Sequence, residues 1–384
     1  MTDVWDELLG QPEAIELIKR AVSEKSQGVH HAWLFTGPAG SGRSLMARAF
    51  AAALQCNQDG CGNCQQCNLS LANAHPDVNM LATERVQISI EEVRALVAKS
   101  TLSSAIGEYR IAIIEDADRM TERTSNVLLK ALEEPESKTI WMLCAPSVAD
   151  LLPTIRSRTR NVVLRMPSDR EVAQLLVQRD GVSMDQGLIA ARQAQNHVGM
   201  ARRLALSQEA RARRSETLRE IIGISNLSRA MVAAEHLLSV AKRDAQSLSE
   251  ERDAKERSNL LRAYGLSEED KLPPNLRAEF KALEENQKRR NTRALRDGID
   301  RIFTDAESLF RDIMAIQLDA SVDLINPEVQ AALEERAASS TVQNTVAVLD
   351  AIAEARLRLA ANVRDLLVLE ALCTRFISRS SVAA

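Results

Sequence analysis

Four cysteines within twelve residues are the strongest chemical signal in this sequence. Cys56, Cys61, Cys64 and Cys67 lie in the segment CNQDGCGNCQQC, and two C-x-x-C steps share Cys64. This spacing lets four thiolates surround one tetrahedral zinc ion at Zn–S distances of about 2.3 Å. We interpret the run as a closed structural zinc site, with four unligated thiols on a loop as the alternative. Because four protein ligands fill the coordination shell, such a zinc leaves no open position for catalysis.

A glycine-rich pattern, GPAGSGRS at residues 37–44, stands between an apolar run at 32–36 and helical spacing at 43–54. In this order of strand, turn and helix, backbone amides and a helix N-terminus bind phosphate; a chance glycine turn is the alternative. The candidate nucleotide-binding residues are Gly37, Gly40, Ser41, Gly42, Arg43 and Ser44. Arg43 replaces the usual lysine, and its planar fork is broader than the ammonium that reaches between phosphates. We therefore expect ATP and Mg²⁺ to bind weakly or not at all.

Two acids follow the apolar run at residues 111–114. A phosphate-loop ATPase has an aspartate here for magnesium, and then a glutamate beside the attacking water. This chain has Glu115 and then Asp116, so the order is inverted. The shorter carboxylate at 116 is misplaced for activating water, and ångström-scale misplacement can cost about 100-fold in rate. A surface acidic cluster is the alternative interpretation.

Composition limits the function further. The chain has 384 residues, a formal net charge of -4, 45% hydrophobic residues and only 3% aromatic residues. This charge does not favour a protein that coats nucleic acid by itself. No secretory pattern opens the sequence, and no apolar run approaches the ~20 residues that cross a bilayer. We expect a cytoplasmic protein, because clustered cysteines in a reducing compartment bind metal more often than they form disulfides.

The alternation of apolar runs and helical spacing predicts a parallel sheet covered by helices over the first 166 residues. We expect strands at 32–36, 78–81, 109–114, 139–144 and 161–164, with helices at 43–54, 90–100 and 124–134. Short helices are expected from Ser168 to about Ser207, because Ser168 and Asp169 form a helix start signal. The expected domains are 1–166, 167–208 and 209–384.

Beyond Glu209 the spacing is helical, with breaks at 271–275 (KLPPN) and near Asn326 and Pro327. Residues 241–300 are densely charged, which predicts a long solvated helical hairpin, with a disordered insert as the alternative. From Thr345 to Phe376 an apolar stripe at helical spacing predicts core or a partner-binding helix.

Several longer segments together resemble the delta-prime family of bacterial DNA polymerase III clamp-loader subunits, which belong to the AAA+ superfamily. These segments are HHAWLFTGPAGSGRS, the four cysteines, IIEDADRMT with NVLLKALEEP, and LLPTIRSRTR. The opening WDELLGQPEAIELIKRAV is similar to the family's N-terminal segment, and GMARRLA to its second sensor, with Arg202 at the arginine position. The resemblance is strong over residues 4–207. It implies a RecA-like domain, a helical lid and an all-helical collar. The charged hairpin resembles an elaboration of actinobacterial relatives.

The resemblance also implies roles for particular residues. Active loader ATPases have a threonine or asparagine near Ala145 and Pro146, as well as the lysine and acid order that this chain lacks. The family's Ser-Arg-Cys motif appears here with threonine in third place, which implies that Arg158 is an arginine finger acting on a neighbour's ATP. An ordinary surface arginine is the alternative.

The expected function is therefore that of a stator without ATPase activity of its own. It would support a DNA-directed DNA polymerase by placing Arg158 against ATP on a gamma or tau subunit. The implied partners are gamma/tau and delta in a pentameric ring, the beta sliding clamp, and primer-template DNA; no membrane is involved. Alternatives are a gamma/tau-type ATPase subunit, and a zinc-dependent nucleic-acid-binding protein with a degenerate nucleotide fold.

Overall fold

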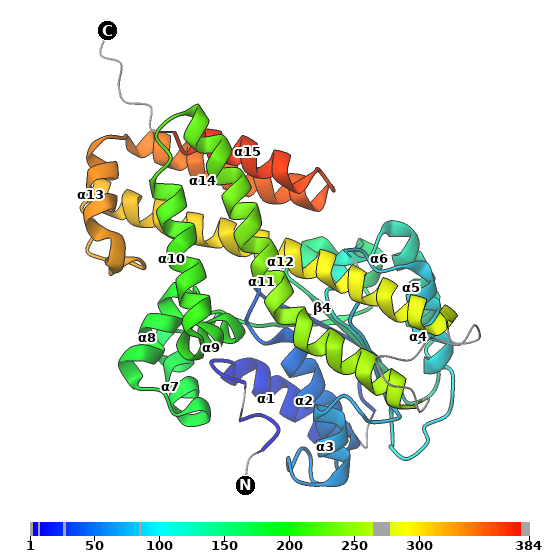
Figure 1. Cartoon of the computed structure of the whole chain (residues 1–384). Coiled ribbons are helices and arrows are strands. Elements are labelled where there is room, and N and C mark those ends of the chain that lie inside the picture. The colour runs from blue at the N-terminus through cyan, green and yellow to red at the C-terminus, as the bar shows by residue number, and fades with distance from the viewer. Residues whose placement is uncertain (1–2, 7, 26–27, 84–85, 264–276, 378–384) are drawn as a thin grey trace. The chain divides into compact units, whose positions relative to one another are not determined.

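The computed structural model describes residues 3–6, 8–25, 28–83, 86–263 and 277–377. The chain divides into two compact units, residues 1–205 and 206–384, which Figure 1 shows in blue to green and in green to red. All residues with the predicted site chemistry lie in the first unit.

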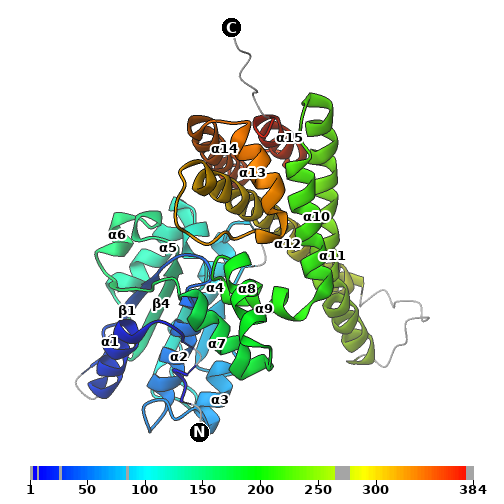
Figure 2. The ribbon, with the colours of Figure 1, turned by 90° about the vertical axis from the view of Figure 1, so that its left-hand side faces the viewer.

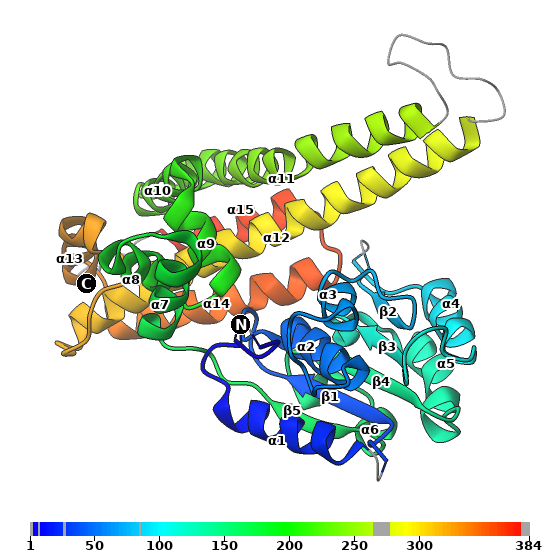
Figure 3. The same cartoon turned by 90° about the horizontal axis from the view of Figure 1, so that it is seen from below.

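The first unit is built on one five-stranded parallel sheet. Its strands are β1 (Ala32–Thr36), β2 (Val78–Leu81), β3 (Arg110–Ile114), β4 (Thr139–Ala145) and β5 (Arg160–Val163). Their order across the sheet is β2-β3-β4-β1-β5, which can be followed in Figure 3. Every pairing is parallel, so the carboxyl ends of all five strands meet at one edge. That edge carries the phosphate loop after β1 and the acid pair after β3.

Helices cover both faces of the sheet. One face packs against α1 (Pro12–Ser23) and α2 (Arg43–Gln55) around the buried rings of Trp33, Phe35 and Phe50. The other face packs against α4 (Ile90–Ser100), α5 (Glu122–Glu133) and α6 (Pro153–Arg156). Figure 2 shows these two layers on either side of β1 and β4. The expected α/β class, a parallel sheet covered by helices, is confirmed, and the fully buried β1, β3 and β4 correspond to the continuous apolar runs of the sequence.

The structure departs from the sequence prediction at the start of α5 and within the cysteine segment. Helix α5 begins at Glu122 rather than at residue 124, because the Thr121 side chain accepts from the Thr124 amide and caps the helix. Helix α3 (Gln65–Leu71) was not predicted; its N-cap is Cys64, whose sulfur accepts from the Cys67 amide. A thiol in this position is not among the usual sequence signals for a helix start.

Three short helices complete the first unit, as predicted: α7 (Asp169–Asp180), α8 (Met184–Gln193) and α9 (Val198–Leu206). Ser168 begins α7 with a capping box, in which its side chain accepts from the Glu171 amide and the Glu171 carboxylate accepts from the Ser168 amide. Glu171 also pairs with Arg165, at 2.6 Å from Nη2 to Oε1. This pair fixes the chain where the sheet domain leads into the short helices, which we call the lid.

The described part of the second unit is helical. It comprises α10 (Gln208–Ile222), α11 (Leu227–Ala263), α12 (Arg277–Gln317), the 3₁₀ turn η4 (Pro327–Val329), α13 (Gln330–Ala338), α14 (Val342–Ala360) and α15 (Asp365–Arg375). Helices α11 and α12 lie side by side as the expected hairpin (Figure 3). They extend beyond residues 241–300 at both ends. The expected break at 271–275 lies outside the described residues.

The stripe at 345–376 is divided between α14 and α15, because Asn362 adopts a left-handed conformation with φ 62°. Ile352, Leu359 and Leu369 are buried in the core of this unit, whereas Val346 and Leu367 are 43% and 53% exposed. The stripe is therefore only partly core. Among the described helices of the chain, none is both long and apolar enough to cross a membrane.

Candidate functional site

The four cysteines converge on one point. Their Sγ atoms all lie within 4.8 Å of one another, and Cys56 Sγ is 3.7 Å from both Cys61 Sγ and Cys64 Sγ. A tetrahedral zinc with Zn–S bonds of about 2.3 Å separates its sulfurs by about 3.8 Å. The spacing therefore fits a zinc ion and is far longer than the ~2.05 Å bond of a disulfide.

The local fold places each thiol. Cys56 ends α2, Cys64 caps α3, and Cys67 lies one turn into that helix, where both Cys56 and Cys67 are buried. Burial alone would raise the pKa of Cys56, but the backbone N–H groups of residues 61, 60 and 58 near its sulfur lower that pKa to about 6. The Gln58 amide donates to Cys56 Sγ at 3.3 Å. Amides that favour a thiolate are the preorganisation that a metal ligand needs.

The phosphate loop has the expected backbone. Gly37, Gly40 and Gly42 have φ angles of 156°, 85° and 92°, and Gly42 begins α2 at its N-terminus. The Gly37 amide donates to the Pro146 carbonyl at 3.1 Å, which ties the loop to the end of β4. Ser41 Oγ is buried and has no hydrogen-bond partner among the described residues. Left-handed glycines before a helix N-terminus are the backbone features by which phosphate loops bind their ligand.

Arg43 is turned inward at the start of α2. Its Nη1 is buried without a hydrogen-bond partner among the described residues, and so is Oδ1 of Asp118. Burial, with repulsion from Asp116, raises the pKa of Asp118, while the charge of Arg43 opposes that rise. Asp118, whose carboxylate is influenced by the charge of Arg43, was not predicted from the sequence. It follows the inverted acid pair by only two positions, and no local pattern separates it from a surface acid.

The acid pair lies where the sequence predicted, after β3. The Glu115 amide donates to the Leu81 carbonyl at 2.9 Å, and both Glu115 and Asp116 are half-buried. Asp116 has a φ of 48°, a left-handed conformation that a non-glycine residue seldom adopts. Its carboxylate lies 3.5 Å from Arg119 Nε. Asp116, the shorter acid, therefore forms an ion pair with Arg119 while its own backbone is strained.

The lid closes against the phosphate loop within the first unit. A Cβ added to Gly40 would lie 2.7 Å from the Cα of His197, so the two backbones are in direct contact. Arg202, the residue at the sensor position, is exposed on α9 and forms an ion pair with Asp180, Nε to Oδ1 2.8 Å. The structure therefore places lid backbone over Gly40, while the Arg202 side chain is engaged within the lid.

Arg158 follows α6 near the molecular surface. Its Nη2 lies 2.7 Å from Glu133 Oε1, and its Nη1 donates to the Thr154 carbonyl at 2.8 Å. The side chain of Arg158 is 34% exposed. Arg156 is exposed and Arg160 stacks over the Trp33 ring at 5.2 Å, so the three nearby arginines have three different environments.

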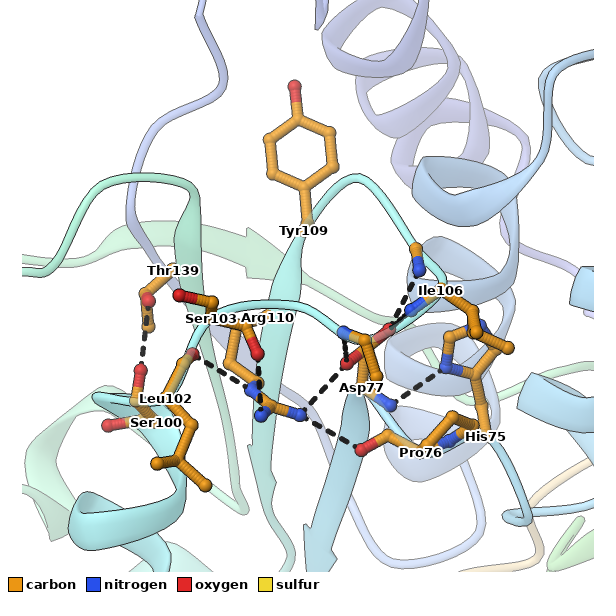
Figure 4. A network of polar contacts seen from close by, with 12 residues as sticks. His75, Pro76, Asp77, Ser100, Leu102, Ser103, Ile106, Tyr109, Arg110 and Thr139 are labelled. Carbon is orange, nitrogen blue, oxygen red and sulfur yellow. Dashed lines mark hydrogen bonds and ion pairs between the residues drawn. The ribbon is translucent and has the colours of Figure 1, made fainter.

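A buried ion pair supports the far end of the sheet (Figure 4). Arg110 Nη1 lies 2.9 Å from Asp77 Oδ1, and the Asp77 side chain is fully buried. The same carboxylate accepts from the amides of residues 105, 106 and 107. Arg110 also donates to the carbonyls of Leu102 and Ser103. This pair could not be predicted from the sequence, because its members are 33 positions apart and lie in no recognisable motif.

The family model and the relatives to which this chain is similar are all subunits of DNA polymerase III. The family model described as "DNA polymerase III, delta subunit" matches residues 10–168. This range contains the cysteines, the phosphate loop and Arg158, and it ends before Arg202. The delta-prime subunit of DNA polymerase III from Pseudomonas aeruginosa is 37% identical over 134 residues, which are 33% of this chain and 41% of the relative.

Two other relatives extend the comparison. The delta-prime subunit from Escherichia coli is 32% identical over 202 residues, which are 51% of this chain and 60% of the relative. A gamma/tau subunit of DNA polymerase III from Mycobacterium bovis is 30% identical over 165 residues, 41% of this chain and 28% of the relative. This chain thus spans about half the length of the delta-prime relatives it matches, between 41% and 60%.

Proposed function

We propose that this chain, whose residues 10–168 match the family model of DNA polymerase III delta subunits, is the delta-prime-type stator of a clamp loader. In this role it supplies Arg158 to ATP bound on a neighbouring gamma/tau subunit. It does not hydrolyse ATP itself. The assembled loader opens a beta sliding clamp and sets it on primed DNA in the cytoplasm, at the replisome.

The observation that carries this proposal is the contrast between two parts of the first unit. The chain's own phosphate loop has Arg43 in place of lysine and lid backbone in contact with Gly40. Arg158, in contrast, is partly exposed and held by a surface ion pair, which is weak in water. A guanidinium that can leave its partner at little cost is suited to phosphate on another subunit.

The cofactors follow from the same geometry. Cys56, Cys61, Cys64 and Cys67 would hold one structural zinc, which stabilises the loop between α2 and α3. Nucleotide would be held weakly or not at all by the residues of the phosphate loop, with Ser44 as the magnesium ligand and Arg202 as a distant sensor. The ion pair of Arg202 with Asp180 supports this proposal of weak nucleotide binding, because it holds the arginine side chain within the lid.

The partners proposed for the chain are gamma/tau and delta subunits in a pentameric ring, the beta clamp and primer-template DNA. The test is reconstitution of the loader from these subunits with and without this chain. We expect the chain to enter a hetero-oligomer of defined mass and to increase clamp- and DNA-stimulated ATP hydrolysis. A loader that assembles and turns over equally well without the chain would contradict the proposal.

A gamma/tau-type ATPase subunit is the second candidate, favoured by the 30% identity to such a subunit over 165 residues. Arg43, the inverted acids and Ala145 with Pro146 in the sensor region all weigh against it. ATP hydrolysis by the isolated chain would separate the two candidates. A zinc-dependent nucleic-acid-binding protein is disfavoured by the net charge of -4, and a salt-dependent DNA titration of the chain alone would test it.

A further inference from the structure

The cysteine loop contacts the beginning of the chain through Gly60. The Val4 amide donates to the Gly60 carbonyl at 3.1 Å. A Cβ added to Gly60 would lie 2.7 Å from Val4 Cγ2 and 3.3 Å from Trp5 Nε1, so neither side chain leaves room for one. Gly60 has a φ of 110°, a conformation that side chains rarely adopt. This approach therefore depends on glycine at that position.

Gly60 also faces the cysteine cluster. It directly precedes Cys61, one of the four clustered cysteines, while its carbonyl accepts from the Val4 amide. The adjoining Asp59 pairs with Lys25 at 3.0 Å, and Lys25 Nζ donates to the Cys56 carbonyl at 2.8 Å. One peptide segment thus links the sulfur cluster to the N-terminal segment, and a shift of the cysteine loop must move Val4 or break its hydrogen bond.

The N-terminal segment then continues to the phosphate loop. Trp5 and Leu8 are 4% and 5% exposed, in the same core as Cys56 and Cys67. Leu8 Cδ2 would lie 3.8 Å from a Cβ on Gly42, an ordinary contact distance. Gln11 Nε2 donates to the Ser41 carbonyl at 3.1 Å. The segment therefore ends on the backbone of the phosphate loop.

Gln11 fixes this end of the segment firmly. It is 3% exposed, and its amide also exchanges two hydrogen bonds with the Arg165 backbone, at 2.6 and 3.0 Å. Buried amides of this kind are costly to leave unpaired. The Ser41 carbonyl and the start of the lid are consequently held by one side chain, and displacing residues 3–6 and 8–10 would disturb both.

We propose that residues 3–6 and 8–11 form a strap through which the metal state of the cysteine loop controls the order of the phosphate loop. The proposal rests on the zinc occupancy proposed above. With zinc bound, the four sulfurs hold Gly60 against Val4 and Trp5, and the strap holds Ser41. Without zinc, the crowded thiols separate and the strap loosens. Because coupling between sites is reciprocal in binding free energy, weakening the strap also weakens zinc binding, and we expect this loss of affinity to appear as faster release.

The test uses the full-length zinc-bound chain. Amide hydrogen exchange is measured before and after zinc removal by a chelator, and zinc release is timed with a coloured chelator. We expect zinc removal to raise exchange in residues 56–67, in the strap and in residues 37–44. Leu8→Ala, which changes no cysteine, is expected to speed zinc release about fivefold or more and to raise exchange at 37–44. Leu102→Ala, at a 58% exposed leucine of the same unit, is the matched control and should change neither.

The outcomes separate the two proposals. If zinc is present but its removal changes exchange at residues 56–67 alone, the strap proposal is wrong and the zinc assignment stands. If Leu8→Ala releases zinc at the wild-type rate, the coupling is likewise absent. A chain that contains no zinc and takes none up would overturn both the zinc site and the strap. The chelation experiment needs no variant, so a poorly folding substitution would not obscure it.

Discussion

Arg158 and Glu133 form an ion pair across the ends of α6 and α5, with 2.7 Å between Nη2 and Oε1. Both side chains are partly exposed, at 34% and 47%, so water screens the attraction and the pair contributes at most about 1 kcal/mol. Two further hydrogen bonds, which Arg158 Nη1 donates to the Thr154 carbonyl and the Ser157 hydroxyl, keep the guanidinium near the surface. Arg158 is thus held by contacts near the surface that cost little to break.

We expect Arg158→Ala to leave folding, zinc content and ring assembly unchanged and to lower the stimulated ATP hydrolysis of the reconstituted loader. The lost activity is the ATP hydrolysis of the one adjacent site, because arginine fingers contribute about 10³ to 10⁵ in rate at the site they serve. Steady-state phosphate release in the presence of clamp and primed DNA measures it. Arg158→Lys should rescue poorly, since an ammonium lacks the planar fork.

The structure also decides the control for this experiment. Arg156→Ala is the matched variant, because Arg156 is exposed. Arg160→Ala is less suitable, because Arg160 covers the Trp33 ring and its loss would also alter packing. Glu133→Gln frees Arg158 and should not reduce turnover. If Arg156→Ala impaired the loader as much as Arg158→Ala, general surface charge would explain the result and the finger would be excluded.

Asp77→Asn is expected to destabilise the first unit by about 3–5 kcal/mol, the usual cost of leaving a buried charge such as Arg110 unpaired. Urea unfolding followed by tryptophan fluorescence measures this unit alone, because the three tryptophans are Trp5, Trp33 and Trp141. Glu108→Gln is the control. It removes a surface pair with Lys138 at 3.4 Å and should change stability by less than about 1 kcal/mol.

The same pair gives a pH dependence with a defined sign. Burial acts to raise the pKa of Asp77, but the amides of residues 105–107 and the charge of Arg110 outweigh it and lower that pKa. The stabilisation is therefore fully present above the unfolded-state value of about 3.9 and is lost as pH falls through the lower folded pKa. The advantage of wild type over Asp77→Asn should shrink below about pH 4. An advantage that grew on acidification would contradict this assignment.

The features that the sequence predicted are local patterns, whereas the features that it did not predict are contacts between residues far apart in the chain. The phosphate loop and the acid pair were predictable because each is a short pattern beside a buried strand, and the cysteine run because its ligand spacing is local. The Asp77–Arg110 pair and the contact of His197 with Gly40 join distant segments, so no window of sequence contains them. Tertiary packing alone brings these residues together.

Helix boundaries failed for a related reason. In TERT, residues 121–124, both threonines could cap a helix, and only the fold selects Thr121. The charge density at 241–300 marked the solvated part of the hairpin, but α11 already begins at Leu227, where Ala230, Ala234 and Leu237 are buried. A high density of charged residues indicates which part of a helix is exposed to water, but it does not indicate where that helix begins.

Zinc removal offers a direct test of the cysteine site. We expect one zinc per chain, because apparent binding energies of structural zinc are about 10–16 kcal/mol. Cys61→Ser should release it and loosen residues 56–67 while the sheet stays folded, since Cys61 is only half-buried. Elemental analysis and circular dichroism measure the two effects. Cys373→Ser, in the second unit, is the control that should retain zinc, and undamaged wild-type protein without zinc would contradict the site.

The isolated chain should hydrolyse ATP no faster than background, because several parts of the nucleotide site depart from a working one. Arg43 replaces the lysine, Asp116 lies in a left-handed conformation beside Arg119, and lid backbone contacts Gly40. Arg43→Lys alone should not create turnover, since Asp116 would still be misplaced for water. Phosphate release and nucleotide binding by calorimetry measure the two properties separately.

The control for this measurement is Arg43→Ala purified in the same way, which reports contaminating ATPase. Exchanging the acids by Glu115→Asp with Asp116→Glu, together with Arg43→Lys, still leaves the backbone of His197 against Gly40. Because the nearest lid atom is a Cα, shortening the His197 side chain would not relieve that contact. The triple variant should therefore bind nucleotide weakly and stay inactive. Clear turnover by wild-type protein, abolished by Asp116→Ala, would instead identify the chain as an ATPase subunit.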